Sequence, residues 1–315
     1  MTYFTHQNNI FKRPIVAMGT FDGVHLGHQK LIQRLVQKAE KLSGEAVIIT
    51  YFHHPLETIH KKTFPYLLTE RAKKEKLLKN LGVDFVLYLK FNQKIAKMSP
   101  EEFLDEIILK EIKTTSLVVG YDTHFGKDRS GDHKFLQSFA QENELEIELI
   151  PPLKIGNRIV SSSIIRDYVR EGNMIEVKKY LGRNYTLAGL VRKGHKLGTG
   201  LGFPTLNINP ADQNKLIPAL GVYLCEILIE EQRYFGLTNV GYSPTLKKTG
   251  ILEVETHILD FAGDLYNEEV EIIFHRKLRE ELHFESRNDL IDAIKADIKA
   301  ARKYFNLKGN DYVLL

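Results

Sequence analysis

The chain has 315 residues, of which 43% are hydrophobic and 27% are charged, and 44 Lys and Arg residues against 40 Asp and Glu residues leave a formal net charge of +4. This length accommodates two domains with separate cores, and the composition is ordinary for a soluble protein. Basic and acidic residues alternate along the chain, so the small positive excess suits phosphate-bearing ligands and excludes the basic footprint of a nucleic-acid-binding protein.

The cysteine content and the apolar runs of the sequence indicate the cellular compartment. Cys225 is the only cysteine, which excludes an intrachain disulfide and fits a reducing environment. Residues 1–6 lack the basic segment and apolar core of a signal peptide. No apolar run in the sequence is long enough to cross a bilayer. We therefore expect a cytoplasmic protein that does not associate with membranes.

The first predicted elements flank a glycine-rich turn. An apolar strand, Pro14–Met18, leads into GTFDGVHLGH at 19–28, and an amphipathic helix follows over 28–42. Glycines let backbone N–H groups approach an anion, and the start of a helix adds partial positive charge. His25 and His28 stand where this helix begins and can donate hydrogen bonds to phosphoryl oxygens during group transfer. The segment predicts nucleotide chemistry at a phosphorus atom.

Other interpretations of this turn remain. A G-x-x-x-G turn is common and by itself specifies little, and the Rossmann and P-loop glycine patterns are both absent. In one alternative, His25 and His28 bind a metal ion together, which would need further ligands from elsewhere in the chain. Asp22 is expected either to order the turn or to hold a metal.

The rest of the first half alternates strand and helix patterns. Ser99 and Pro100, followed by two glutamates, are a strong helix start with a capping box. This alternation predicts a parallel sheet covered on both faces, with ligands beyond the carboxyl ends of its strands. His25, His54 and Asp122 all follow predicted strands, so one site can gather them. Further strands are expected over 46–50, 83–89, 117–120 and 146–150, and a helix over 72–81.

The second half is rich in β-strand patterns. Its strands follow one another with little helix between them, which predicts an antiparallel sheet or barrel. Ser286 is a plausible cap for one closing helix, whose apolar stripe contains Leu290, Ile294, Ile298 and Ala301. The strands are expected over 186–191, 221–230, 233–240, 252–260 and 269–274.

The motif T-F-D-G-V-H-x-G-H at 20–28 resembles the signature of the bacterial riboflavin kinase/FAD synthetase family, within the H-x-G-H nucleotidyltransferases. Three later segments continue the likeness: TYFHHP at 50–55, VGYDTHFG at 119–126 and SSSIIR at 161–166. Serines opening a helix place hydroxyls and N–H groups together, and an arginine one turn later can grip a polyphosphate.

The resemblance implies a Rossmann-like α/β nucleotidyltransferase domain over 1–183. Its catalytic residues would be His25 and His28. Its flavin contacts would be His54, Asp122 and Phe125. Thr123 stands where the family usually has an aromatic residue, and this difference would affect the flavin pocket. The implied nucleotide contacts are Gly19, Phe21, Asp22, Gly23, Gly27, Ser161, Ser162 and Arg166.

The second half resembles the riboflavin kinase part of the same family. The segments that show this likeness are GTGLGFPTLN at 198–207, NVGYSPT at 239–245 and the strand 252–266. The resemblance implies an antiparallel barrel over 184–306. The residues Gly309, Asn310 and Asp311 predict a flexible tail over 307–315. Thr205 and Asn207 would hold Mg²⁺ through hard oxygen ligands. Glu255 would be the general base, with Glu253 as its rival if the register slips.

Further contacts follow from the same motifs. Asn239 would contact the flavin, and Gly198, Gly202 and Pro204 the nucleotide. Two departures, Thr199 for arginine and Leu206 for alanine, would weaken the kinase.

The implied function is bifunctional: ATP phosphorylates riboflavin to FMN, and a second ATP adenylylates FMN to FAD with release of pyrophosphate. The expected partners are riboflavin, FMN, ATP and Mg²⁺, without nucleic acid, and a weak homo-oligomer is left open. Two alternatives stand beside this interpretation. One is a monofunctional FMN adenylyltransferase with a weakened kinase domain. The other is a flavin-binding regulator without turnover.

Overall fold

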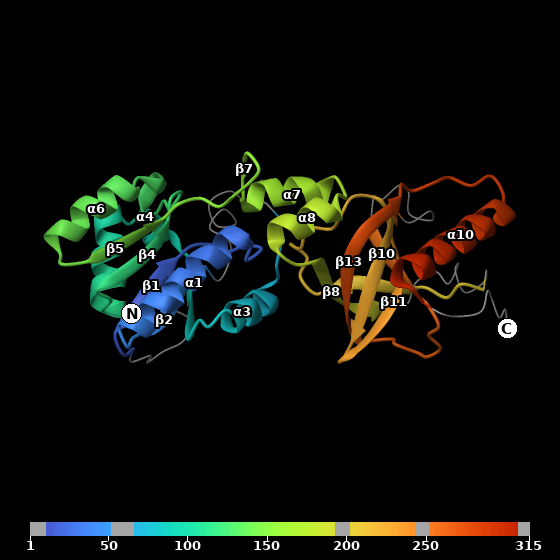
Figure 1. Cartoon of the computed structure of the whole chain (residues 1–315), viewed down its shortest axis with the longest axis horizontal. Helices are drawn as coiled ribbons and strands as arrows, with labels where there is room; N and C mark the ends of the chain where they lie inside the picture. Colours follow the sequence, from blue (N-terminus) through green and yellow to red (C-terminus); the bar gives the residue numbers. More distant parts are fainter. Residues whose placement is uncertain (1–10, 52–65, 193–201, 243–251, 308–315) are drawn as a thin grey trace. The chain divides into compact units, whose positions relative to one another are not determined.

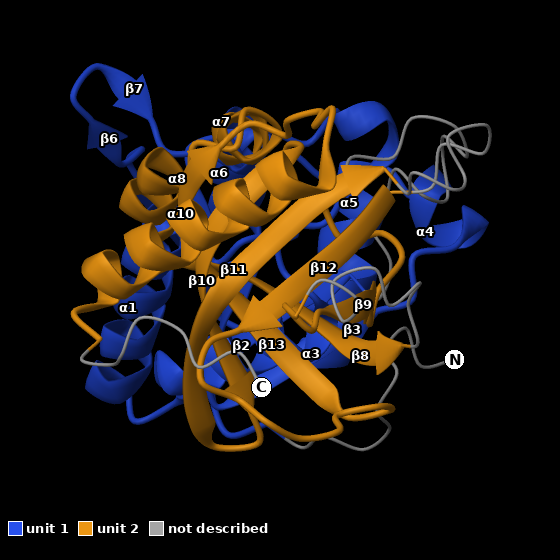
Figure 2. Cartoon of the chain, turned by 90° about the vertical axis from the view of Figure 1, so that its right-hand side faces the viewer, with its two compact units in different colours: residues 1–162 blue, residues 163–315 orange. Residues whose placement is uncertain are grey.

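The computed structural model describes residues 11–51, 66–192, 202–242 and 252–307. The chain divides into two compact units, residues 1–162 and 163–315, each built around its own sheet (Figures 1 and 2). Within the described ranges, no helix combines the length and apolar character needed to span a membrane.

The first unit is an α/β layer structure, as the alternating patterns predict. Its elements are β1 (Pro14–Met18), α1 (Leu26–Lys41), β2 (Glu45–Tyr51), α3 (Arg71–Asn80), β3 (Phe85–Leu89), α4 (Gln93–Lys97), α5 (Pro100–Phe103), the π-helix η1 (Leu104–Ile112), β4 (Ser116–Gly120), the 3-10 helix η2 (Lys127–Arg129), α6 (His133–Glu142), β5 (Glu146–Ile150) and the short hairpin of β6 (Lys154–Ile155) and β7 (Arg158–Ile159).

Its five strands form a parallel sheet in the order β3-β2-β1-β4-β5. Alternate residues of β1 enter two different cores, because successive side chains of a strand point to opposite faces. Ile15 and Ala17 pack with α1 and α3, whereas Val16 and Met18 pack with η1 and α6. The chain leaves β1 toward β2 on one side and reaches β4 on the other, so the crevice for a ligand opens beyond the carboxyl end of β1.

The second unit begins with two helices and continues as a barrel. Its elements are α7 (Ser162–Arg170), α8 (Met174–Leu181), β8 (Tyr185–Arg192), β9 (Leu206–Pro210), β10 (Gly221–Ile229), β11 (Gln232–Tyr242), β12 (Leu252–Ile258), β13 (Glu269–Arg279) and α10 (Arg287–Phe305).

The six strands close into an antiparallel barrel in the order β10-β11-β12-β9-β8-β13. The predicted closing helix, α10, lies along the outside against β10 and β11, where Ile298 and Ala301 pack with Leu224 and Leu237 (Figure 2). Cys225 is fully buried, and burial raises the pKa of its thiol to about 12, so the thiol stays protonated near neutral pH.

The predicted strands and helices are confirmed, with bounds that differ by a few residues. Sequence analysis missed the helices α4, α6 and α8, the 3-10 helix η2, the strand β9 and the hairpin of β6 and β7. β9 is short, has the sequence LNINP and follows a glycine-rich segment. Asparagine and proline both disfavour strands, so the pairing partners rather than propensity decide this element.

The capping box at Ser99 forms as predicted. The Ser99 hydroxyl accepts a hydrogen bond from Glu102 N at 3.1 Å, and the Glu102 carboxylate accepts one from Ser99 N at 2.8 Å. α5 and η1 follow directly and carry Phe103, Ile107 and Ile108 into the core. The cap therefore fixes where a buried helix begins.

We expect Ser99→Ala to lower the free energy of unfolding of the first unit by about 1 kcal/mol, because the Glu102 N–H loses the hydroxyl that accepts its hydrogen bond. Urea unfolding followed by circular dichroism measures this change. Glu101→Gln, which leaves the box intact, is the control and should cost less. Equal losses in both variants would contradict the role of the cap.

Candidate active sites

The turn after β1 has an unusual backbone. Phe21, Gly23 and Val24 have φ angles of +47°, +85° and +40°. Such angles suit Gly23 but are strained for a phenylalanine and more so for a β-branched valine. Strain of this kind persists only where surrounding groups determine the conformation, and it concentrates at functional sites.

Asp22 holds the turn to the segment before α3. Its buried carboxylate accepts hydrogen bonds from Leu68 N at 3.0 and 3.1 Å and from Thr69 N at 3.1 Å. Buried carboxylates require such donors, and charged hydrogen bonds are the stronger kind. Of the two roles left open for Asp22, this geometry supports the ordering of the turn.

Two further side chains hold the turn through its carbonyl oxygens. The Ser162 hydroxyl donates to Asp22 O at 2.8 Å, which brings the predicted serine run to the turn. Ser161 directly precedes α7, and Arg166 is a buried residue one turn into that helix. The Gln29 side chain donates to Val24 O at 2.9 Å.

Lys74 of α3 and Thr50 at the end of β2 meet at the Thr20 carbonyl oxygen. Lys74 Nζ lies 3.2 Å from Thr20 O and 3.2 Å from Thr50 Oγ1, and Thr50 Oγ1 donates to Thr20 O at 3.1 Å. Burial lowers the pKa of Lys74 to about 8, although the charge of Asp22 raises it. Sequence analysis placed Lys74 in the helix predicted over 72–81 and gave it no role. Its spacing of four residues from buried Leu78 was the available signal.

His25 and His28 lie together at the start of α1. His25 is the N-cap, and its Nδ1 atom accepts a hydrogen bond from His28 N at 3.2 Å. The two rings stack with their centroids 3.6 Å apart. Because Nδ1 of His25 is an acceptor, the neutral ring carries its proton on Nε2. A donor at a helix N-terminus can then face an anion.

Gly27 allows this arrangement. A Cβ atom at position 27 would lie 3.2 Å from two ring atoms of His25 and 3.4 Å from Val160 O. Any side chain there would press on the His25 ring. Gly19 has a different task, because its N–H donates to Ile49 O at 3.0 Å and extends the pairing of β1 with β2. The nucleotide contacts assigned to Gly19, Phe21, Gly23 and Gly27 stay predictions.

The predicted flavin contacts of this unit lie in different surroundings. Asp122 is exposed and follows the carboxyl end of β4, next to the crevice. Phe125 is buried in the core, with its ring centroid 5.7 Å from that of Phe103 and 6.3 Å from that of Phe135. Core packing explains the position of the Phe125 ring, and the contact of Phe125 with a flavin stays a prediction. His54 lies outside the described residues.

The barrel brings the predicted kinase residues into one row. Glu255 of β12 is paired with Asn207 of β9 on one side and with Asn239 of β11 on the other. Directly paired residues share a face of the sheet and lie about 5 Å apart at Cβ. Glu253 is paired with Gly241 instead, two residues along the strand. The register therefore distinguishes the two glutamates, and Glu255 is the one between the amides.

The segment before β9 is anchored to β12. His257 Nδ1 donates to Pro204 O at 2.8 Å, and the ring of Phe203 meets that of His257 edge-on. Burial lowers the pKa of His257, so its ring is neutral at pH 7. Thr205 lies between this anchor and Asn207. Its hydroxyl, the Asn207 amide oxygen and the Glu255 carboxylate are hard oxygen donors of the kind that Mg²⁺ prefers.

The remaining kinase residues are less fully described. Gly202 has a φ of +85°, which a glycine adopts without strain, whereas Gly198 and Thr199 lie outside the described residues. Leu206 is paired with Thr256, a residue buried to 1% exposure. Successive residues of a strand face opposite ways, so Leu206 turns away from the face that carries Asn207.

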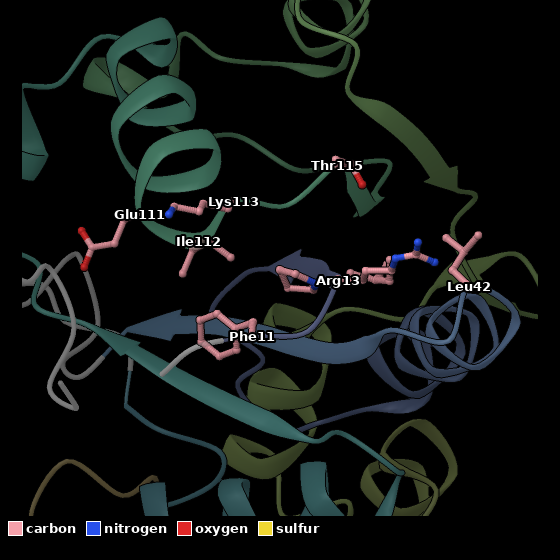
Figure 3. A pocket seen from close by; sticks show the side chains of 9 residues that line it. Phe11, Arg13, Leu42, Glu111, Ile112, Lys113 and Thr115 are labelled. Atoms are coloured by element: carbon pink, nitrogen blue, oxygen red, sulfur yellow. The ribbon is translucent and has the colours of Figure 1, made fainter. Parts of the chain in front are cut away.

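A cavity of about 600 Å³ lies in the first unit but not at these residues (Figure 3). It is lined by Phe11, Arg13, Leu42, Ile112 and Lys113, among others, next to the amino end of β1. The glycine-rich turn follows the carboxyl end of that strand. This cavity and the residues of the glycine-rich turn therefore lie at opposite edges of the sheet.

Comparison with known proteins relates both units to flavin enzymes. Residues 7–164 match the FAD synthetase family, and residues 181–305 match the riboflavin kinase family. The chain belongs to the family of bifunctional riboflavin kinase/FMN adenylyltransferases. The two matches leave residues 165–180 unassigned. The predicted domain boundary between residues 183 and 184 stays a prediction.

Several members of this family align over most of the chain. The bifunctional riboflavin kinase/FMN adenylyltransferase of Pseudomonas fluorescens is 37% identical over 91% of this chain and 92% of its own length. Those of Listeria monocytogenes and Escherichia coli K12 are 33% and 32% identical, over 92% and 93% of this chain and of their own lengths. A crystal structure described as a macrolide-efflux protein from Streptococcus pneumoniae superposes with a TM-score of 0.84 at 29% identity, covering 92% of this chain and 94% of the other.

We expect Asp22→Asn to destabilise the FAD synthetase unit by about 1–2 kcal/mol, because the hydrogen bonds from two backbone N–H groups change from a charged acceptor to a neutral amide oxygen. Amide hydrogen exchange at Leu68 and Thr69 should accelerate, since a neutral oxygen accepts more weakly than a carboxylate. Asp105→Asn, an exposed change in the same unit, is the control. Unchanged protection at both amides would contradict the anchoring role of Asp22.

Proposed function

We propose that this protein phosphorylates riboflavin to FMN in its barrel and adenylylates FMN to FAD in its α/β unit, with ATP as co-substrate in both reactions. The observation that carries the proposal is that each unit gathers the polar residues of its own motifs. His25 and His28 stack at one helix start, and Asn207, Glu255 and Asn239 form one row across three strands. The efflux named for the Streptococcus structure is not carried over, because these residues suit phosphate chemistry.

In adenylyl transfer, an oxygen of the FMN phosphate attacks the α-phosphorus of ATP. A new P–O bond forms, the bond to the bridging oxygen breaks, and pyrophosphate leaves. His25 and His28 would donate hydrogen bonds to the phosphoryl oxygens, and the N-terminus of α1 would favour the same negative charge. Ser161, Ser162 and Arg166 would hold the remaining phosphates. Positioning and charge stabilisation suffice, without a covalent enzyme intermediate.

In the kinase reaction, a ribityl hydroxyl of riboflavin attacks the γ-phosphorus of ATP and ADP leaves. Glu255 would accept the hydroxyl proton, with Asn207 and Asn239 beside it to orient the reacting groups. Thr205 and Asn207 would hold Mg²⁺, which when bound offsets the negative charge of the phosphates. We also propose a cytoplasmic location, since a chain with a single cysteine fits a reducing compartment.

The direct test is to incubate the pure protein with riboflavin, ATP and Mg²⁺ and to separate the flavins. Formation of FMN and then FAD is the expected result. FAD from supplied FMN, with none from riboflavin, would instead identify the monofunctional adenylyltransferase. Tight flavin binding without any product would identify a regulator.

We expect His28→Ala to lower kcat for FAD formation from FMN by about 100-fold to 1000-fold, the usual effect of removing one donor to a developing oxyanion. The free energy of unfolding should change by less than about 1 kcal/mol, because the proposed partner is a substrate phosphate. His133→Ala, at the start of α6, is the control and should leave the rate unchanged. A loss of stability that matches the loss of rate would reject the assignment.

Glu255→Gln should lower kcat for FMN formation by about 100-fold to 10,000-fold, since the amide cannot accept the proton. FAD formation from supplied FMN should stay near the wild-type rate. Glu253→Gln is the matched control on the same strand face, opposite Gly241, and should retain kinase activity. The two-site assignment fails if Glu255→Gln slows both reactions in parallel, and the register assignment fails if Glu253→Gln is the inactive variant.

A further inference from the structure

A partly buried lysine underlies the glycine-rich turn, and the motif chemistry does not use it. Lys74 lies on α3, and its ammonium group donates to the Thr20 carbonyl within the turn and to the hydroxyl of Thr50, where β2 ends. It therefore links the carboxyl ends of β1 and β2, the edge of the sheet where an α/β fold binds its ligand.

The position of the charge decides what it can do. Thr20 O accepts hydrogen bonds from both Lys74 and Thr50, so this carbonyl is strongly polarised. A polarised peptide carbonyl makes the N–H of the same peptide, here that of Phe21, a better donor. A cation behind a turn also raises the potential in front of it, which favours a phosphate there. The first effect acts through Thr20 and the second through space, so neither needs direct contact of Lys74 with a ligand.

The surroundings of Lys74 disfavour a positive charge. A charge that is retained in such a place indicates a function. Its ammonium lies 5.7 Å from the ring centroid of Tyr88, and the guanidinium of Arg71 lies over the same ring at 5.6 Å. Asp22 is the nearby charge that favours the ammonium, and Arg71 opposes it. An apolar residue at this position of α3 would avoid the cost of burying the charge.

We propose that Lys74 is a positioning residue for adenylyl transfer. It fixes the Thr20 carbonyl and places a positive charge behind the turn that receives the phosphates. This inference rests on the proposed function of the α/β unit.

The pH dependence of the reaction follows from the charge. Burial lowers the pKa of Lys74 to about 8, so the ammonium loses its proton well below the usual range for lysine. Tyr88, the titratable group facing it from β3, has a pKa raised to about 12 by burial and stays neutral in this interval. Asp22 and Arg71 are the charged groups beside the ammonium. FAD formation should therefore fall as the pH rises through about 8.

The test compares Lys74→Met, Lys74→Arg and the wild type in FAD formation from FMN between pH 6.5 and about 9.5, a range chosen to bracket the pKa of Lys74. At pH 7 the methionine variant should lose about tenfold to a hundredfold in kcat, the equivalent of one charged hydrogen bond. The arginine variant should keep the wild-type order of rate and lose the alkaline fall, because arginine does not titrate there. Lys76→Met, an exposed change on the same helix, is the matched control and should behave as the wild type.

Kinase activity of the same samples serves as the internal standard and should be unaffected by either change at position 74. A wild-type profile that is flat above pH 8, or a methionine variant as active as the lysine enzyme, would overturn the role of Lys74. The arginine variant and the wild-type profile decide the question even if the methionine variant unfolds. Absence of FAD formation by the wild type at every pH would reject the proposed function itself, and the inference with it.

Discussion

The first unit depends on how the polar backbone of one strained turn is satisfied. Phe21 and Val24 take left-handed conformations that their side chains disfavour, so groups from outside the turn must hold it. Leu68 and Thr69 bind the Asp22 carboxylate, Lys74 and Thr50 bind the Thr20 carbonyl, and Ser162 binds the Asp22 carbonyl. The turn joins segments far apart in sequence, which is why it can serve as the centre of a binding site.

A second constraint, the hydrogen-bond register of the barrel, performs the corresponding task in the other unit. Glu255 stands between Asn207 and Asn239 because three strands pair at these positions. A shift of one residue in β12 would send every one of its side chains to the opposite face. The apolar residues that alternate with this row, such as Val254 and Ile258, are buried and oppose such a shift. Packing of the core thus fixes the position of the polar residues.

Prediction from sequence succeeded where short-range signals agree. Pro14–Met18 is a fully buried apolar run, Ser99 forms its capping box, and Ser286 caps the last helix through Asp289. It does not reach a side chain's surroundings where these come from distant segments. Phe125 is packed among core aromatics while its flavin contact stays a prediction, and Lys74 received no role within the helix predicted over 72–81. Neither environment is visible in a window of neighbouring residues. Leu206, one of the two departures from the kinase motif, lies within a strand and turns away from the face that carries Asn207.

The sequence by itself determined the two-part architecture and the chemistry of each part. Periodicity distinguishes alternating elements from successive strands, and the motif residues name phosphate-binding groups. Tertiary structure alone decided that Asp22 orders a turn, that Glu255 rather than Glu253 meets the two asparagines, and that Lys74 donates to the Thr20 carbonyl of the glycine-rich turn. The physical reason is that local pattern reports the conformation of a segment, whereas strand register and burial depend on segments that meet only when the chain folds.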